Sequence, residues 1–347
     1  MAVELLNEAN HIGHAMIVGG GVAGCILASR LCSSLPEHPI LLLEAGPEQD
    51  DRVAPSMGVA FSDPSDIQWN YLSVPQGALE EKIIKQSQGK VLGGSSAVNF
   101  QAWTRGSAAD FDRWALEVGN ERWSWSGMLP YFERSETYFP AWDAPQTRPD
   151  AHGCSSPIRV SHTSSSGSSC NYPLKAMVAD VFGSAGLRRN SDINSGDPLG
   201  CGESACATYQ GKRQWAASYP HGSKVTLWSS FQASKVLVVG ERAVGVETLR
   251  DGSGVVKAMA RREVIVCCGA QNSARLLLLG GTCAMGQVLD SECRVVGVER
   301  PRVVDASVSP FAIGAHDQTA VYAAAELARF PRRRRDRLAP YRAWRTG

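Results

Sequence analysis

Residues 14–31 read HAMIVGGGVAGCILASRL, and this stretch decides the fold. Its apolar residues 15–18 are typical of a buried strand in a parallel sheet, and its second half has the pattern of a helix. Between the two, Gly19, Gly21 and Gly24 have the spacing G-x-G-x-x-G. In a dinucleotide-binding turn the first glycine permits the tight turn, the second lets the backbone approach a pyrophosphate, and the third lets the helix pack closely on the strand. The stretch therefore predicts the strand, turn and helix of a nucleotide-binding domain.

A second apolar run agrees with this prediction. Residues 40–43 (ILLL) read as the next parallel strand, and Glu44 follows 20 residues after the last glycine of the turn, where a partner for ribose hydroxyls is expected. We predict that the amides of Val22 and Ala23 face phosphate oxygens at the start of the helix, and that Glu44 and Ala45 lie near the ribose. The fold class is then α/β, with a Rossmann-like domain. A glycine-rich turn in an ordinary α/β unit remains the alternative, and the turn alone does not distinguish NAD from FAD.

The composition narrows the class of protein. The chain has 347 residues, 44% of them hydrophobic and 20% charged, which is enough for about two domains. No apolar run approaches the ~18 residues of a membrane span, and the acidic, polar N-terminus does not read as a secretory signal. The ten cysteines form no CxxC pair and the seven histidines are dispersed, so we predict neither a disulfide framework nor a metal site. We expect a soluble, cytoplasmic globular protein without a membrane partner.

The charge is distributed unevenly along the chain. Residues 329–347 contain eight arginines and one aspartate, a net charge of +7, whereas the whole chain carries +1. The run RRRR at 332–335 is a feature of nucleic-acid-binding segments and of localisation signals. Charge repulsion, together with Pro331 and Pro340, favours a solvated tail instead. We therefore expect residues 329–347 to be a basic, disordered tail and expect no nucleic-acid partner.

Residues 89–112, GKVLGGSSAVNFQAWTRGSAADFD, are rich in small residues followed by aromatic ones. Residues 93–96 can present successive backbone amides to an anionic group, and Asn99 can hydrogen-bond the edge of a planar ring. Over its whole length this stretch resembles the first signature of the glucose-methanol-choline (GMC) family of FAD-dependent oxidoreductases. The form containing WTR at 103–105 is most similar to fungal members that oxidise alcohols in secondary metabolism. The resemblance implies FAD as the cofactor, contacted by Val91, Gly94, Ser95, Asn99, Phe100, Gln101 and Ala102.

The resemblance continues in the second half of the chain. Residues 235–249 (KVLVVGERAVGVETL) have the composition of a β-hairpin, and Ala233 just before them falls on the family's adenine-contact position. Residues 263–268 read as a strand that leads through a glycine into a helix near 273–279, as in the family's second signature. Asp305 and Ala306 fall on a flavin-contacting turn. An NAD(P)-dependent dehydrogenase would rest on the glycine turn alone and is disfavoured by the stretch at 89–112.

The same resemblance places His316 on one of the two active-site positions of the family, which histidine or asparagine occupies. Alcohol oxidation requires removal of the hydroxyl proton while hydride leaves the carbon, and a histidine suits the proton transfer because its usual pKa of about 6.5 lies near working pH. The family's first active-site histidine precedes a TCxMG-like segment. Here TCAMG at 282–286 follows the second signature directly, and Leu278 stands at that histidine's position. The block of substrate domain that normally separates these landmarks is absent.

These features define the expected organisation and two hypotheses for the function. Residues 15–136 and 224–328 are predicted to form a discontinuous FAD-binding domain, and residues 137–223 a partial substrate domain of loops with a helix near 175–185. The first hypothesis is a GMC-type oxidoreductase that oxidises an alcohol on a small, secondary metabolite, with His316 as proton acceptor. The second is a shortened flavin-binding remnant with little or no turnover, because the missing block leaves the flavin open to water.

Overall fold

The structure is a computed structural model that describes residues 11–48, 50–53, 58–141, 149–162, 164, 174–250, 254–277 and 283–328. The predicted basic tail, 329–347, and the junction at 278–282, where a missing substrate-domain block was predicted, lie outside these residues.

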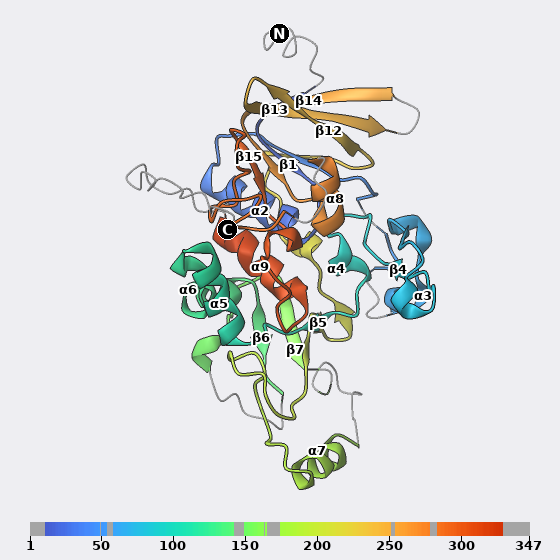
Figure 1. The fold of residues 1–347 in the computed structure, drawn as a ribbon, viewed down its shortest axis with the longest axis vertical. Coiled ribbons are helices and arrows are strands. Elements are labelled where there is room, and N and C mark those ends of the chain that lie inside the picture. Colours follow the sequence, from blue (N-terminus) through green and yellow to red (C-terminus); the bar gives the residue numbers. More distant parts are fainter. Residues whose placement is uncertain are drawn as a thin grey trace.

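The largest element is a mixed seven-stranded sheet at one end of the molecule (Figure 1). Its main path runs in the order β11-β2-β1-β14-β13-β12, and β15 pairs with β14 beside this path. The strands are β1 (His11–Val18), β2 (Ile40–Leu43), β11 (Val225–Trp228), β12 (Gln232–Val239), β13 (Arg242–Arg250), β14 (Gly254–Val266) and β15 (Pro301–Val303). The strand order, with β1 parallel to both β2 and β14, confirms the Rossmann-like α/β fold predicted from the sequence.

The parallel core of this sheet follows directly from the apolar runs. All four residues of β2 are buried, as are Met16, Ile17 and Val18 of β1, because both faces of a parallel sheet are covered by other elements. The predicted strand at 40–43 coincides with β2. The predicted hairpin at 235–249 corresponds to the antiparallel pair β12 and β13. Strand β14 is longer than predicted, since it begins at Gly254 and pairs first with β13 and then with β1.

The helices near the sheet are α2 (Val22–Ser34), α8 (Gly269–Leu276) and α9 (Asp317–Ala328). Helix α9 packs against α2 and also against α6 (Trp125–Arg134). An ion pair joins α2 to α9, in which Arg30 lies 2.8 Å from the fully buried carboxylate of Glu326. The segment that carries His316, just before α9, is thereby fixed relative to the glycine turn, which lies just before α2.

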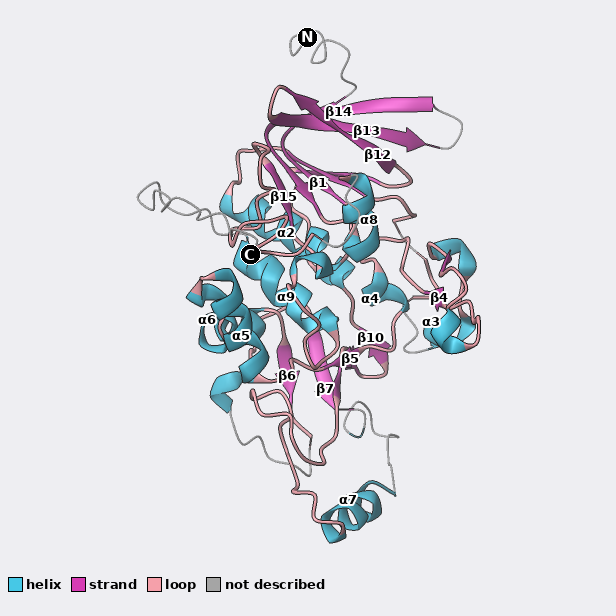
Figure 2. Cartoon of the chain, in the orientation of Figure 1, coloured by secondary structure: helices cyan, strands magenta, loops and turns pink. Residues whose placement is uncertain are grey.

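A smaller, four-stranded sheet lies on the far side of α9 from the large sheet (Figure 2). It has the order β5-β8-β7-β6, with β5 (Ala102–Trp103), β6 (Thr137–Phe139), β7 (Arg159–His162) and β8 (Ala205–Cys206). These short strands were not predicted from the sequence. Strand β5 belongs to the stretch 89–112, so its pairing with β8 joins that stretch to residues of 137–223. Helix α7 (Leu174–Ser184) corresponds to the predicted helix and projects at the end of the molecule.

The remaining elements are α3 (Gly58–Ser62), α4 (Ser95–Val98), α5 (Ala108–Val118), and the two-stranded pairs β3 (Tyr71–Leu72) with β4 (Lys85–Gln86) and β9 (Thr208–Tyr209) with β10 (Lys212–Arg213). In the described part of the chain, no helix has both the length and the apolar character needed to cross a bilayer.

Candidate cofactor and active site

A cavity of about 820 Å³ opens at the carboxyl ends of the central strands, where Val18, Leu43 and Cys267 contribute to its wall. This volume lies in the upper part of the usual range for ligand pockets, roughly 300–1,000 Å³. In open α/β sheets the carboxyl ends of the strands are where nucleotides bind. The residues predicted to act in the site that line the cavity are Gly19, Gly21, Val22, Ala23, Glu44, Ala45, Gly94, Ser95, Asn99, Ala233, Asp305, Ala306 and His316.

In the glycine turn, Gly24 and Gly21 lack a side chain for two different structural reasons. A Cβ on Gly24 would lie 1.9 Å from the carbonyl oxygen of Gly19, so glycine is required there for the helix to pack onto the turn. A Cβ on Gly21 would come no closer than 3.9 Å to the protein atoms around it, and Gly21 lines the cavity. The turn therefore keeps free space in front of the first amides of α2, which is the arrangement needed for close approach of a phosphate.

Glu44 follows β2 and is buried. One of its oxygens accepts a hydrogen bond from the Gly20 amide at 2.9 Å, and the other accepts one from the Gly46 amide at 2.8 Å. Burial raises the pKa of Glu44 to about 7, although the backbone donors and the charge of Lys90 oppose this rise. The carboxylate is thus held rigidly at the cavity wall.

The stretch 89–112 forms a second wall of the cavity. Asn99 at the end of α4 accepts hydrogen bonds from the Gln101 amide at 3.0 Å and from Arg213 at 3.2 Å, and its amide group donates to Gln318 at the start of α9. Asn99 therefore connects this wall to the segment that carries His316. On the opposite side, Asp305 accepts a hydrogen bond from the Gly269 amide at 2.9 Å and thereby fixes its turn against the start of α8.

Five of the predicted cofactor-binding residues are not among those that line the cavity. Gly24 packs inside the turn, and Val91 is buried in a cluster with Val59 and Ile67. Phe100 is 53% exposed and contacts Phe61 edge-to-face at 5.1 Å. Gln101 has a positive φ of 62° and its buried side chain donates to the carbonyl of Ala207, whereas Ala102 pairs with Cys206 in the small sheet. Their assignment to the cofactor remains a prediction from the resemblance.

His316 is exposed at the edge of the cavity and is held from the WTR segment. Its ring Nδ1 lies 2.8 Å from Thr104 Oγ1, and its backbone amide donates to the same oxygen at 3.1 Å. The Thr319 hydroxyl donates to the carbonyl oxygen of Thr104. The loop just before His316 is anchored to α5, because the Gly314 amide donates to Asp110 Oδ2 at 2.9 Å. His316 is therefore fixed at Nδ1 and at its backbone, which leaves Nε2 as the nitrogen for chemistry.

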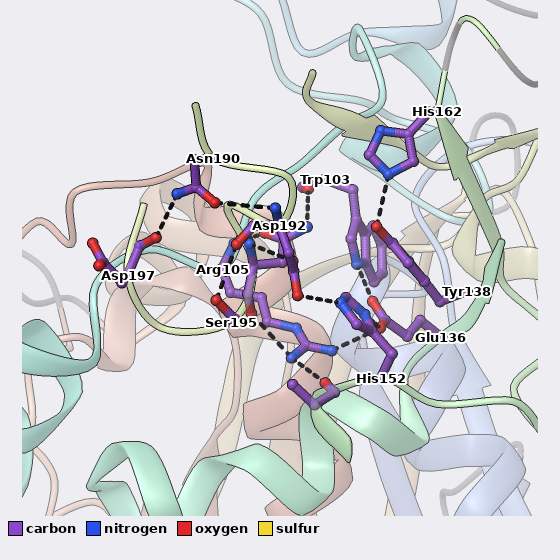
Figure 3. A network of polar contacts seen from close by, with 12 residues as sticks. Trp103, Arg105, Glu136, Tyr138, His152, His162, Asn190, Asp192, Ser195 and Asp197 are labelled. Carbon is purple, nitrogen blue, oxygen red and sulfur yellow. Dashed lines mark hydrogen bonds and ion pairs between the residues drawn. The ribbon is translucent and has the colours of Figure 1, made fainter. Parts of the chain in front are cut away.

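Sequence reasoning missed a buried ionic network next to this segment (Figure 3). The side chains of Arg105 and Glu136 are both fully buried, with Nη2 and Oε1 2.7 Å apart. His152 Nδ1 lies 2.6 Å from the same Glu136 oxygen, and its Nε2 lies 3.1 Å from Asp192. The Trp103 indole donates to the other Glu136 oxygen at 2.7 Å. The network joins residues of the WTR segment to the loops around the small sheet.

Charge pairing controls the ionisation of this network. Burial by itself would raise the pKa of Glu136 and Asp192, but the Arg105 charge and the bonds from His152 hold both pKa values below their usual range. Burial would likewise lower the pKa of His152, but its bonds to Asp192 and Glu136 raise it above the usual value. The two carboxylates thus favour the protonated form of His152, whose ring nitrogens lie 2.6 Å from Glu136 and 3.1 Å from Asp192.

The family model for GMC oxidoreductases matches residues 14–297, which is most of the chain. The chain belongs to the GMC oxidoreductase family. Two relatives illustrate the likeness. The GMC-type oxidoreductase acuG of Aspergillus aculeatus is 35% identical over 269 residues, which cover 77% of this chain and 46% of that protein. The mitochondrial choline dehydrogenase of Mus musculus is 36% identical over 281 residues, covering 77% of this chain and 45% of that protein. The chain thus spans about half the length of the curated GMC relatives it matches.

Solved GMC-type structures agree with the fold. A formate oxidase structure from Aspergillus oryzae, whose title refers to FAD modification, superimposes with a TM-score of 0.71 at 25% identity and covers 78% of this chain and 48% of its own. A pyridoxine 4-oxidase superimposes with a TM-score of 0.69 at 26% identity, covering 83% of this chain and 55% of its own. FAD is the cofactor that the family implies, in agreement with the sequence-based prediction. The free space at Gly21, the helix amides behind it and the volume of the cavity fit this cofactor.

Among the described residues, no group of three or more histidine, cysteine or acidic side chains is arranged to hold a metal ion.

Proposed function

We propose that this protein is a FAD-dependent oxidoreductase that oxidises an alcohol group of a small, secondary metabolite. The observation that carries the proposal is the shared cavity. The glycine turn, the segment Gly94–Asn99, the turn at Asp305 and the exposed His316 all contribute to its wall. A nucleotide-binding turn and a histidine suited to proton transfer are thus combined in one site.

The chain's own residues would hold the cofactor as follows. The amides of Val22 and Ala23 at the start of α2 bind phosphate oxygens, helped by the positive end of the helix. Each Glu44 oxygen accepts one backbone hydrogen bond and retains a lone pair for a ribose hydroxyl. Asp305 and Ala306 line the cavity from the other side, where the flavin is expected to lie. When bound, FAD supplies the hydride acceptor that alcohol oxidation requires.

His316 supplies the proton acceptor in this proposal. Its Nδ1 is engaged by Thr104, so Nε2 is the nitrogen that receives the proton of the alcohol. A substrate reaches it from the solvent side, because His316 is exposed at the edge of the cavity. Positioned acid–base catalysis of this kind contributes typically about 10²–10⁴-fold to a rate.

The exposure of His316 also favours a second candidate function, a flavin-binding protein with little turnover. Electrostatic catalysis depends on excluding water from the reacting groups, and an exposed base lacks that protection. The chain spans about half the length of its relatives, so whether it turns over an alcohol has to be tested with this chain itself.

An absorbance spectrum of the purified protein, followed by anaerobic addition of candidate primary alcohols, separates these functions. Flavin bands that bleach with an alcohol support the oxidoreductase, and bands that never bleach support the binding protein. A colourless protein that cannot be reconstituted with FAD contradicts both. His316→Ala is expected to abolish bleaching while retaining the flavin bands. His38→Ala, which alters a histidine that does not line the cavity, is the matched control and is expected to bleach normally.

A further inference from the structure

The Thr104 hydroxyl oxygen lies 2.8 Å from Nδ1 of the His316 ring, which leaves open which of the two atoms carries the shared hydrogen. We propose that Thr104 is a positioning residue that sets the tautomer of His316, accepting hydrogen bonds from its backbone amide and from its Nδ1–H so that Nε2 carries no hydrogen. The proposal deepens the proposed function and rests on it where catalysis is concerned. Its first test requires neither flavin nor turnover.

Two nitrogen atoms of His316 contact the Thr104 hydroxyl oxygen. The His316 amide donates to Thr104 Oγ1 at 3.1 Å, and Nδ1 lies 2.8 Å from the same atom. A threonine hydroxyl has two lone pairs, so it can accept hydrogen bonds from both nitrogens, as the proposal requires. The hydroxyl hydrogen can then bond to water, because this contact lies at the exposed edge of the cavity. The hydrogen bond made by one imidazole nitrogen decides which nitrogen carries the hydrogen.

Thr104 can act in this way because its backbone is held on both sides. Asn194 accepts a hydrogen bond from the Arg105 amide at 2.8 Å and donates to the Trp103 carbonyl at 3.0 Å, so one side chain brackets the threonine. The Thr104 carbonyl is itself bonded by the hydroxyl of Thr319, on the helix that follows His316.

The side chains on either side of Thr104 are held as well. Trp103 and Arg105 both bond to the carboxylate of Glu136, at 2.7 Å each (Figure 3). Thr104 lies between these two residues, and its hydroxyl contacts His316 and not Glu136. The buried Glu136 carboxylate therefore anchors the side chains of both neighbours of Thr104.

The tautomer can be measured in the full chain without FAD. Long-range ¹H–¹⁵N correlation spectra of ¹⁵N-histidine-labelled protein at pH 8, above the usual imidazole range, report which nitrogen carries the hydrogen. The His316 signal is identified by its loss in His316→Gln. We expect the Nδ1–H tautomer in the wild type, a shift toward Nε2–H in Thr104→Val, and recovery in Thr104→Ser. Thr226→Val, at an exposed position of β11, is the matched control and is expected to leave the signal unchanged.

The outcomes separate the proposal from the proposed function. A wild-type His316 that carries its hydrogen on Nε2, or a tautomer unaffected by Thr104→Val, overturns the role of Thr104 whatever the flavin does. If any variant fails to fold, the wild-type spectrum alone decides. In holoprotein that turns over, Thr104→Val is expected to lower kcat about 10- to 100-fold with little change in KM, and Thr104→Ser to restore it, since a misplaced base costs rate rather than binding. A protein without flavin or bleaching refutes the proposed function alone.

Discussion

Replacing Glu136 by glutamine removes the charge at the centre of the buried network. Glutamine has the same size and its oxygen can still accept the Trp103 indole hydrogen bond. It leaves Arg105, whose side chain has no exposed surface, without the carboxylate that lies 2.7 Å away, and it leaves His152 without its contact at 2.6 Å. Breaking a buried ion pair by removing one partner typically costs about 3–5 kcal/mol. We expect the free energy of unfolding to fall by this amount in Glu136→Gln.

The matched control is Glu117→Gln on the surface of α5. Glu117 pairs with Arg113 at 2.8 Å, four residues away, and the side chains of the pair are 38% and 63% exposed. Exposed pairs of this kind contribute about 0.3–0.5 kcal/mol. Urea unfolding followed by far-ultraviolet circular dichroism, with linear extrapolation to water, compares both variants with the wild type. A loss in Glu136→Gln below about 1 kcal/mol, or no larger than in Glu117→Gln, would refute the argument that Arg105 depends on this carboxylate.

Three further outcomes are expected. Gly21→Ala should leave the melting temperature of the protein without FAD unchanged and should weaken FAD binding in an equilibrium titration. Gly24→Ala should lower the free energy of unfolding by about 1–3 kcal/mol, because its methyl group would overlap Gly19. Equal effects of the two variants on stability would contradict the conclusion that Gly21 leaves space for a phosphate and Gly24 allows helix packing. Burial raises the pKa of Glu44 to about 7, so the protonated carboxyl stabilises the fold below about pH 4.5, and this stability is lost as the pH rises to 7, by at most about 3 kcal/mol. Urea unfolding at pH 5 and pH 8 should show this loss in the wild type and not in Glu44→Gln. Equal losses in the two proteins would contradict the assignment to Glu44. The pKa of His152 is raised, so its charged form stabilises the fold fully below about pH 6.5 and less as the pH rises through the raised pKa. The difference in the free energy of unfolding between the wild type and His152→Gln should therefore shrink between pH 6 and 9. A constant difference would be inconsistent with a protonated His152.

The parallel core could be predicted because its signals are local. The run Ile40–Leu43 is short, wholly apolar and followed by an acidic residue, and the structure gives β2 the same bounds. The antiparallel half of β14 was not predicted, since Gly254–Ala260 (GVVKAMA) shows no regular alternation of apolar and polar residues and pairs with β13 along the sheet. The strands β5 to β8 are two to four residues long, too short for a periodic pattern to indicate them.

The site was predictable only where a residue contributes its backbone or occupies a family position. Gly19 and Gly21, singled out by their spacing, and His316, singled out by the resemblance, line one cavity, whereas Gly24 does not. The exposure of Phe100 and the inward turn of Gln101 depend on contacts with Phe61 and Ala207, which no local pattern reveals. The ionic network was missed for the same reason, because its members lie far apart in the sequence. No signal in the sequence indicated that Arg105 would be buried, because arginine side chains are mostly exposed unless they are paired.

The position of β1 between β2 and β14 has a consequence for how the protein is made. On one side Val18 of β1 pairs with Leu43, which is close in the sequence, and on the other side it pairs with Val266. Of these three residues, Val266 is synthesised last. At synthesis rates of about 5–20 residues per second, the apolar edge of β1 waits on the order of ten seconds or more for its second neighbour. An exposed strand edge of this kind pairs readily with other chains. We therefore expect the yield of protein in a cell to depend on protection of β1 during synthesis, separately from the stability of the finished fold.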